Sequence, residues 1–209
     1  GVLLRDTNTS ITSSEGDITL DGIAGSSTTA GANFGVAVQS GAVIESTGTG
    51  ANAATITLTG TGGTVTSLIY GVILADAGST ITAIDGDITI TGIGGDALVG
   101  NGHGIVLRGA TIESTGTDAN AAQITLQGTG GNGPGNNFRG IVLVENTQIT
   151  SISGDINLEG TGGSGDANNA GVQVSGSTIR STGTGATVAD ITITGTAGSG
   201  TDPQTGLIV

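Results

Sequence analysis

Apolar and polar residues alternate over short segments along the whole chain, and glycine-rich breaks separate these segments. A tetrad of glycine, aliphatic residue, any residue and aliphatic residue recurs, and its first copy is Gly1-Val2-Leu3-Leu4. Further copies begin at Gly35, Gly71, Gly104, Gly140, Gly171 and Gly206, at intervals of 31 to 36 residues. The chain is therefore built from internal repeats, and each tetrad has the alternation of a short β-strand.

Two more apolar-alternating segments follow each tetrad. The second segment centres on one isoleucine, at Ile11, Ile44, Ile81, Ile112, Ile149 and Ile179. The third carries a pair of aliphatic residues, at Ile18/Leu20, Ile56/Leu58, Ile88/Ile90, Ile124/Leu126, Ile156/Leu158 and Ile191/Ile193. No segment sustains the 3.6-residue period of a helix, so the pattern predicts three strands per repeat and essentially no helix.

These repeats predict an all-β fold: a right-handed parallel β-helix (solenoid) with three short strands per coil and about six coils of 31–36 residues. Residues 1–209 are interpreted as a single β-solenoid segment, with coils starting at residues 1, 35, 71, 104, 140 and 171 and the first strand of a seventh at 206. Parallel strands stack about 4.8 Å apart, so six coils would rise roughly 29 Å. The chain begins and stops on a first strand, and we expect it to be a fragment of a larger repetitive protein.

A second period covers two coils. Odd coils join their second and third strands through a tight turn such as Asp85-Gly86-Asp87, whereas even coils use a longer loop such as residues 114–120. The repeating unit is thus a pair of coils. Glycine clusters follow the third strand, as at Gly60-Thr61-Gly62-Gly63, and we expect them to supply positive φ at a corner.

The composition fits a narrow core and disfavours several partners. The 209 residues include 42 glycines, three aromatic residues and no cysteine, so medium-sized aliphatic residues must fill the core. Seventeen acids against four arginines give a net charge of −13, which repels nucleic acid and anionic lipid. No apolar run approaches the roughly 20 residues that span a bilayer. We expect no nucleic-acid partner, no membrane insertion and an extracellular or cell-surface location.

The alternating blocks of the chain resemble a known family. Residues 44–50 (IESTGTG) and 56–63 (ITLTGTGG) are similar to the repeat regions of filamentous-haemagglutinin-like exoproteins, large bacterial surface proteins that include cyanobacterial ones. The resemblance covers the whole chain and lies in composition and period. It implies a right-handed β-helix that acts as an adhesin, stalk or fibre.

Some right-handed β-helices act on polysaccharides, so the positions of titratable residues bear on catalysis. Asp17, Asp87 and Asp155 fall in alternate coils, about 9.6 Å apart, which is too far for a shared metal or a retaining carboxylate pair. They are interpreted as turn acids that cap corner amides. The single histidine, His103, fits a planar corner stack better than a catalytic base. The sequence therefore predicts no enzyme, no catalytic, cofactor-binding or metal-binding residue, and no cofactor.

Runs of Thr-Ile-Thr raise the question of ice binding. A flat ice-binding face needs threonine at both outward sites of the third strand in successive coils. Aspartate, glutamine and asparagine interrupt the predicted outward pairs, as at Asp17/Thr19, Gln123/Thr125 and Asp155/Asn157. The sequence thus disfavours an ice-binding face.

The outward position of the first strand is apolar in most coils. It is occupied by Leu3, Ala37, Ile73, Val106, Val142 and Ile208, with Gln173 as the exception. A contiguous apolar strip on a solvated face needs covering. Two explanations stay open: long glycine-rich loops fold back over the strip, or the strip packs laterally against another copy or domain.

The leading functional hypothesis is a structural stalk or fibre segment of a secreted or cell-surface, adhesin-like bacterial protein. An alternative is a self-assembling extracellular filament subunit whose copies stack end to end. A more distant alternative is a polysaccharide-binding or polysaccharide-degrading β-helix. We expect self-association, by axial stacking of copies and by lateral packing through the strip. A host or matrix ligand is also expected, and the sequence does not identify it.

Overall fold

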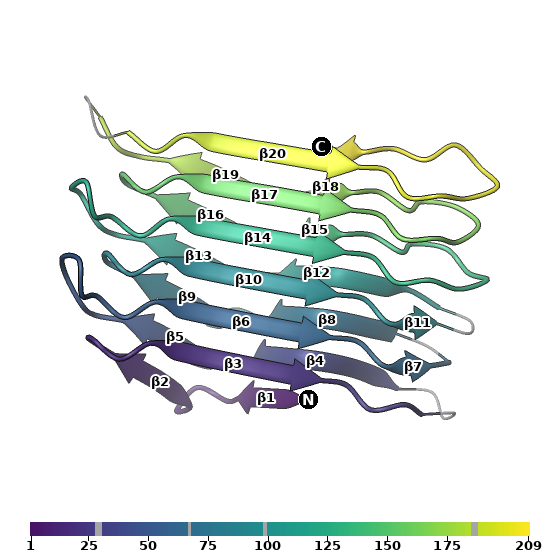
Figure 1. Ribbon diagram of the computed structural model, residues 1–209, viewed down its shortest axis with the longest axis horizontal. Helices are drawn as coiled ribbons and strands as arrows, with labels where there is room; N and C mark the ends of the chain where they lie inside the picture. The colour runs from purple at the N-terminus through teal and green to yellow at the C-terminus, as the bar shows by residue number, and fades with distance from the viewer. Residues whose placement is uncertain (28–30, 67, 98–99, 185–187) are drawn as a thin grey trace.

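The computed structural model describes residues 1–27, 31–66, 68–97, 100–184 and 188–209. The regular secondary structure within these ranges consists of β-strands and includes no helix. The strands form three parallel sheets that wind around one core (Figure 1). The predicted fold, a parallel β-solenoid with three strands per coil, is therefore confirmed. We name the sheets A, B and C, in the order in which each coil contributes to them.

The strand bounds follow the predicted repeats. Sheet A contains β1 (Val2–Arg5), β4 (Ala32–Gln39), β8 (Leu68–Ala75), β12 (Gly102–Arg108), β15 (Ile141–Val144), β18 (Val172–Val174) and β21 (Leu207–Ile208). Sheet B contains β2 (Ser10–Ser13), β5 (Val43–Ser46), β9 (Thr80–Ala83), β13 (Thr111–Ser114), β16 (Gln148–Ser151) and β19 (Thr178–Ser181). Sheet C contains β3 (Ile18–Ile23), β6 (Ile56–Thr61), β10 (Ile88–Ile93), β14 (Ile124–Thr129), β17 (Ile156–Thr161) and β20 (Ile191–Thr196).

The solenoid is right-handed. In Figure 1 the strands of sheet C lie in front and run to the right, whereas those of sheet A lie behind and run to the left. The chain climbs from β1 at the bottom to β20 at the top. A chain that crosses the front rightward, returns leftward behind and moves upward follows a right-handed path, which is the hand that parallel crossovers favour.

Like residues stack on like residues in the core. The isoleucines of sheet B pair in register from Ile11 to Ile179 through the four intervening coils. The four middle isoleucines are fully buried together with the inward aliphatic residues of sheets A and C. Each coil thus covers the apolar side chains of its neighbours, as expected for a repeat that cannot bury its own face.

Two glycine columns bring the end of sheet C against the start of sheet A. One column is Gly22, Gly60, Gly92, Gly128, Gly160 and Gly195, and the other includes Gly35, Gly71, Gly104, Gly140, Gly171 and Gly206. A Cβ atom on Gly92 would lie 2.3 Å from the carbonyl oxygen of Gly104, and one on Gly104 would lie 2.5 Å from the backbone nitrogen of Thr129. Only a residue without Cβ allows this approach. We call this line of contact the glycine pinch.

The glycine clusters after the third strand do not have the positive φ that we expected. Gly60, Gly62 and Gly63 instead pack against backbone, and a Cβ on Gly63 would lie 2.2 Å from the carbonyl oxygen of Gly25. Positive φ recurs at a different corner, between sheets A and B, at Asp6, Ser40, Asp76, Gly109, Glu145 and Gly176. The clusters therefore serve close stacking and not turn conformation.

Beyond the glycine pinch the chain forms a second, narrower lobe, at the right of Figure 1. This lobe includes the short strands β7 (Thr64–Val65) and β11 (Asp96–Ala97). Ile69, Ala97 and Phe138 form a buried cluster there, separate from the main core. A Cβ on Gly95 would lie 1.9 Å from the carbonyl oxygen of Gly63, so stacked glycine backbone forms part of the lobe. The sequence did not predict this lobe.

Candidate interaction surfaces

The apolar strip lies on the outer side of sheet A. Its middle members Ala37, Ile73, Val106 and Val142 are 0%, 5%, 6% and 6% exposed. They form their own apolar cluster, and Phe34, Tyr70 and Val144 from the strands of sheet A pack against it. Side chains from neighbouring positions of the same sheet therefore cover these four residues, a cover that neither of the two explanations had included.

The two ends of the strip differ from its middle. Leu3 is 46% exposed, and Ile208 is half-buried. The strip therefore offers little apolar area to another molecule except at these ends. Lateral packing of the strip against another copy stays a prediction.

Planar side chains form a column beside the strip. The rings of Tyr70 and His103 stack with centroids 5.9 Å apart and an interplanar angle of 10°, which confirms the predicted planar corner stack at His103. The Nδ1 atom of His103 accepts a hydrogen bond of 3.3 Å from the backbone N–H of Arg139. One face of the Tyr70 ring therefore lies against the ring of His103, and Tyr70 as a whole is half-buried.

Burial determines the ionisation of this column. Burial first and the charge of Arg139 second lower the pKa of His103 from 6.5 to about 3. Burial also raises the pKa of Tyr70 and lowers that of Arg139. The side chain of His103 is only 6% exposed. A catalytic base must reach the substrate, and this buried, neutral imidazole has little access to one.

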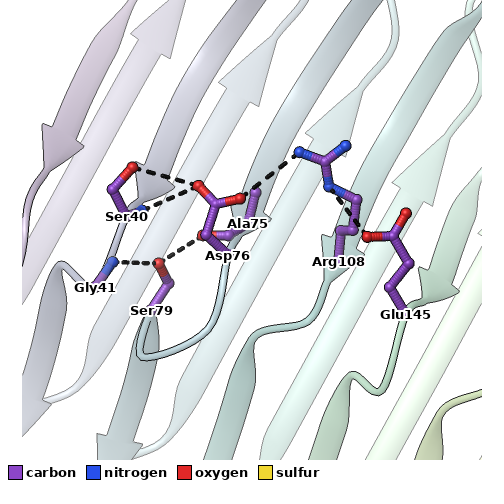
Figure 2. A network of polar contacts seen from close by, with 7 residues as sticks. All are labelled: Ser40, Gly41, Ala75, Asp76, Ser79, Arg108 and Glu145. Atoms are coloured by element: carbon purple, nitrogen blue, oxygen red, sulfur yellow. Dashed lines mark hydrogen bonds and ion pairs between the residues drawn. The ribbon is translucent and has the colours of Figure 1, made fainter.

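A polar network joins four consecutive coils at the corner between sheets A and B (Figure 2). The backbone N–H and the hydroxyl of Ser40 both donate to Oδ2 of Asp76, each at 3.3 Å. Arg108 lies 3.8 Å from Oδ1 of Asp76 through Nη2 and 3.8 Å from Oε2 of Glu145 through Nε. These side chains are about half exposed, so each ion pair contributes at most about 1 kcal/mol.

A buried pair of hydrogen bonds underlies this network (Figure 2). The hydroxyl of Ser79 donates to the carbonyl oxygen of Ala75 at 2.6 Å and accepts from the backbone N–H of Gly41 at 3.0 Å. The hydroxyl thus satisfies two backbone groups of adjacent coils at a corner where the sheet ladder is interrupted. The corner therefore joins adjacent coils to one another along the axis.

The acids between sheets B and C act as caps. The backbone N–H groups of Thr55, Gln123 and Asp190 donate to Oδ1 of Asp17, Asp87 and Asp155 at 2.9, 2.9 and 2.8 Å. Each donor belongs to the even coil that follows the acid's odd coil, which confirms the predicted capping of corner amides. The hydrogen bonds from the backbone and side chain of Thr55 lower the pKa of Asp17. In the described part of the chain, no three His, Cys, Asp or Glu side chains gather into a metal site.

The outer face of sheet C is rich in threonine. Its outward positions, coil by coil, are Thr19, Asp21 and Ile23; Thr57, Thr59 and Thr61; Thr89, Thr91 and Ile93; Thr125, Gln127 and Thr129; Asn157, Glu159 and Thr161; Thr192, Thr194 and Thr196. Twelve of these eighteen positions are threonine. We call this surface the threonine face, and all its residues are exposed or half-buried.

This face is wider than the sequence indicated. The predicted outward pairs began at the Asp17 column, but the strands of sheet C begin one residue later and run to Ile23 and its equivalents. The outward columns of Thr59 and Thr61 were therefore missed. The continued alternation of Thr59-Gly60-Thr61 was the signal, but its glycine had been assigned to a turn.

No protein-family model, curated protein or solved structure matches this chain. The class of protein therefore rests on the fold itself. The chain has three parallel sheets, and like residues stack on like in its core from one coil to the next. These features define a parallel β-solenoid repeat protein.

Proposed function

We propose that the chain is a structural segment, a rigid rod that serves as the stalk or fibre of a secreted or cell-surface, adhesin-like protein. The continuity of all three hydrogen-bond ladders and of the core columns along the axis supports this most directly. In such a ladder, every added coil extends the rod by about 4.8 Å without changing its cross-section. Length is then set by the number of coils.

The charged residues suit this role. The net charge of −13 keeps neighbouring rods apart in solution. Arg108 and its acidic partners join coils at one corner, and Asp87 with its equivalents joins them at another. Among the described residues there is no helix with the length and hydropathy that a membrane span needs.

The proposal assigns no catalysis to the chain. The carboxylates of Asp17, Asp87 and Asp155 accept hydrogen bonds from backbone amides. The side chain of His103 is buried and stacks on the ring of Tyr70. A polysaccharide-acting site needs carboxylates free to reach the substrate. The arrangement of these residues therefore supports a mechanical role over an enzymatic one.

The test is the shape of the purified chain and of a lengthened variant. Duplication of residues 71–139, which are the third and fourth coils, should lengthen the rod by about 9.6 Å and leave its width unchanged. Small-angle X-ray scattering and electron microscopy measure both dimensions. A duplicated chain that widens, or that loses its β-sheet circular dichroism, would count against the rod.

The same measurements separate the stalk from the filament subunit. A stalk segment gives rods of constant length over a range of protein concentrations. Long unbranched filaments that grow with concentration would instead favour copies stacked end to end. Turnover of a polysaccharide by the purified chain would support the enzymatic alternative.

A further inference from the structure

The three outer faces of the solenoid are occupied differently. The outer side of sheet A carries the covered apolar strip. The central outward column of sheet B alternates threonine with charge, as Thr12, Glu45, Thr82, Glu113, Thr150 and Arg180. The threonine face of sheet C has no arginine or lysine, and its acids are limited to Asp21 and Glu159. A neutral hydroxyl surface on a protein with a net charge of −13 calls for an explanation other than solubility.

The hydroxyl groups of the threonine face are free. None of its twelve threonines uses its hydroxyl in a hydrogen bond within the described residues. Their β-branched side chains have few rotamers on a strand, so methyl and hydroxyl groups are held in fixed directions. The surface is therefore an ordered array of unpaired donors and acceptors beside methyl groups.

The backbone beneath the array is rigid. The strands of sheet C pair in register over six residues in every coil. Their inward residues in coils two to four, such as Ile56, Leu58, Ile88 and Ile90, are fully buried. The array therefore repeats about every 4.8 Å along the axis and about every 6.6 Å along the strands.

These observations restrict the kinds of ligand that the threonine face can bind. A protein partner would need large aromatic or arginine anchors, and the threonine face has none. A sugar chain would pack the flat side of its rings on aromatic rings, and Phe34, Tyr70 and Phe138 all lie elsewhere. Ice presents a neutral lattice of hydrogen-bonding oxygen atoms that repeats on the same scale as the array. We propose that the threonine face binds ice.

The adjacent pair of coils with the most threonine on this face is the second and the third. Thr57, Thr59 and Thr61 occupy all three columns of one coil, and Thr89, Thr91 and Ile93 occupy those of the next. Thr91 and Ile93 at the edge of this pair, together with Gln127 and Glu159 of the following coils, line a hollow of about 270 Å³. Residues 57–61 and 89–93 are therefore the proposed centre of ice contact. The outward columns of Thr59 and Thr61, which the sequence did not reveal, are part of this centre.

The proposal is tested by ice-affinity partitioning and by inhibition of ice recrystallisation. The chain should enter a slowly grown ice front and keep ice crystals small. The double variant Thr59→Lys/Thr91→Lys places two hydrated charges at the centre of the face and should lose most of both activities. The matched control is Thr82→Lys on sheet B, where lysine would lie between Glu45 and Glu113; it should keep them.

Circular dichroism and thermal melting show whether each variant keeps the fold. The proposal is overturned if the unaltered chain is excluded from ice, or if the double variant binds ice as well as the control does. It is also overturned if the chain binds cellulose or chitin above freezing and Thr59→Lys/Thr91→Lys abolishes that binding, because the face would then belong to a neutral polysaccharide. None of these outcomes bears on the rod architecture.

Discussion

The main core and the narrower lobe lie on opposite sides of the glycine pinch and are built by different means. In the main core, inward aliphatic residues stack in columns from coil to coil, and most are fully buried. Among the described residues of the lobe, the buried apolar cluster consists of Ile69, Ala97 and Phe138. Glycine backbone stacked on glycine backbone takes the place of side chains around it.

This difference shows two ways of closing a solenoid coil. Aliphatic columns gain stability from apolar area removed from water, at roughly 25 cal/mol per Å². In the described part of the lobe such side chains are few, and hydrogen bonds join successive turns, such as those from the backbone N–H of Ala97 to Asn132 and from that of Gly133 to Ser164. The pinch lets both parts share the same axial repeat, because it holds sheets C and A at backbone contact distance.

The largest expected effect comes from a side chain placed in the pinch. Gly92→Val would put its Cβ 2.3 Å from the carbonyl oxygen of Gly104 and 2.6 Å from the side chain of Ile105, so it would collide with backbone and with a core side chain. We expect unfolding to become easier by about 4 kcal/mol or more, since the two sheets must separate. Urea unfolding followed by circular dichroism measures this change.

The control for that substitution is Gly25→Ala. No atom lies within 4 Å of the Cβ that this change would add, so the midpoint of unfolding should stay near that of the parent chain. A Gly92→Val chain as stable as the control would show that the pinch is not a point of close contact.

A smaller effect is expected within the lobe. Phe138→Ala removes a fully buried ring and should lower the free energy of unfolding by about 3 kcal/mol. Stacked glycine backbone can partly collapse onto the space, which places the loss near the lower end of its range. Hydrogen exchange should increase most at the amides of β7 and β11. Equal increases in sheet B would mean that core and lobe form one cooperative unit.

The smallest of the three effects depends on pH. The pKa of His103 falls from 6.5 in the unfolded chain to about 3 in the folded one, so the unfolded chain binds the proton more tightly. Stability from this residue is therefore fully present above pH 6.5 and is lost as the pH falls toward about 3. We expect a loss of roughly 2 kcal/mol by about pH 5.

His103→Phe keeps a planar ring next to Tyr70 and removes the titration. Its free energy of unfolding should depend less on pH between 6.5 and about 3 than that of the parent chain. Measurement by urea unfolding at a series of pH values gives both curves. Parallel curves would show that the carboxylates alone determine the acid response.

The sequence was sufficient to predict the main core but not the lobe. Isoleucines at fixed spacing, such as Ile44, Ile81 and Ile112, specify a column because a strand alternates strictly between its two faces. Glycine carries no such information, since it suits a turn, a bulge and a close approach equally. Gly60 was therefore assigned to a corner and Gly71 to the start of a strand, although their recurrence as a pair in every coil was a sign of contact between them.

The surfaces were predicted less well for a related reason. The apolar strip, with Ile73 and Val106, was correctly placed on the outer side of sheet A. The side chains of Phe34 and Tyr70 pack against the strip, and this cover depends on the direction in which they point. That direction is set by packing and cannot be obtained from alternation alone. The caps of Asp17, Asp87 and Asp155 were predicted because turn acids have a short list of backbone partners.

The alternation of tight and long turns has a consequence for inheritance. The glycines of the second and third tight turns pack on a carbonyl of the preceding long loop: a Cβ on Gly86 would lie 1.8 Å from the oxygen of Ala54, and one on Gly154 would lie 1.9 Å from that of Ala122. Removal of one coil would set two turns of the same kind against each other. We therefore expect gene duplication and loss in such a protein to conserve blocks of two coils, so that rod lengths among descendants differ in steps of about 9.6 Å.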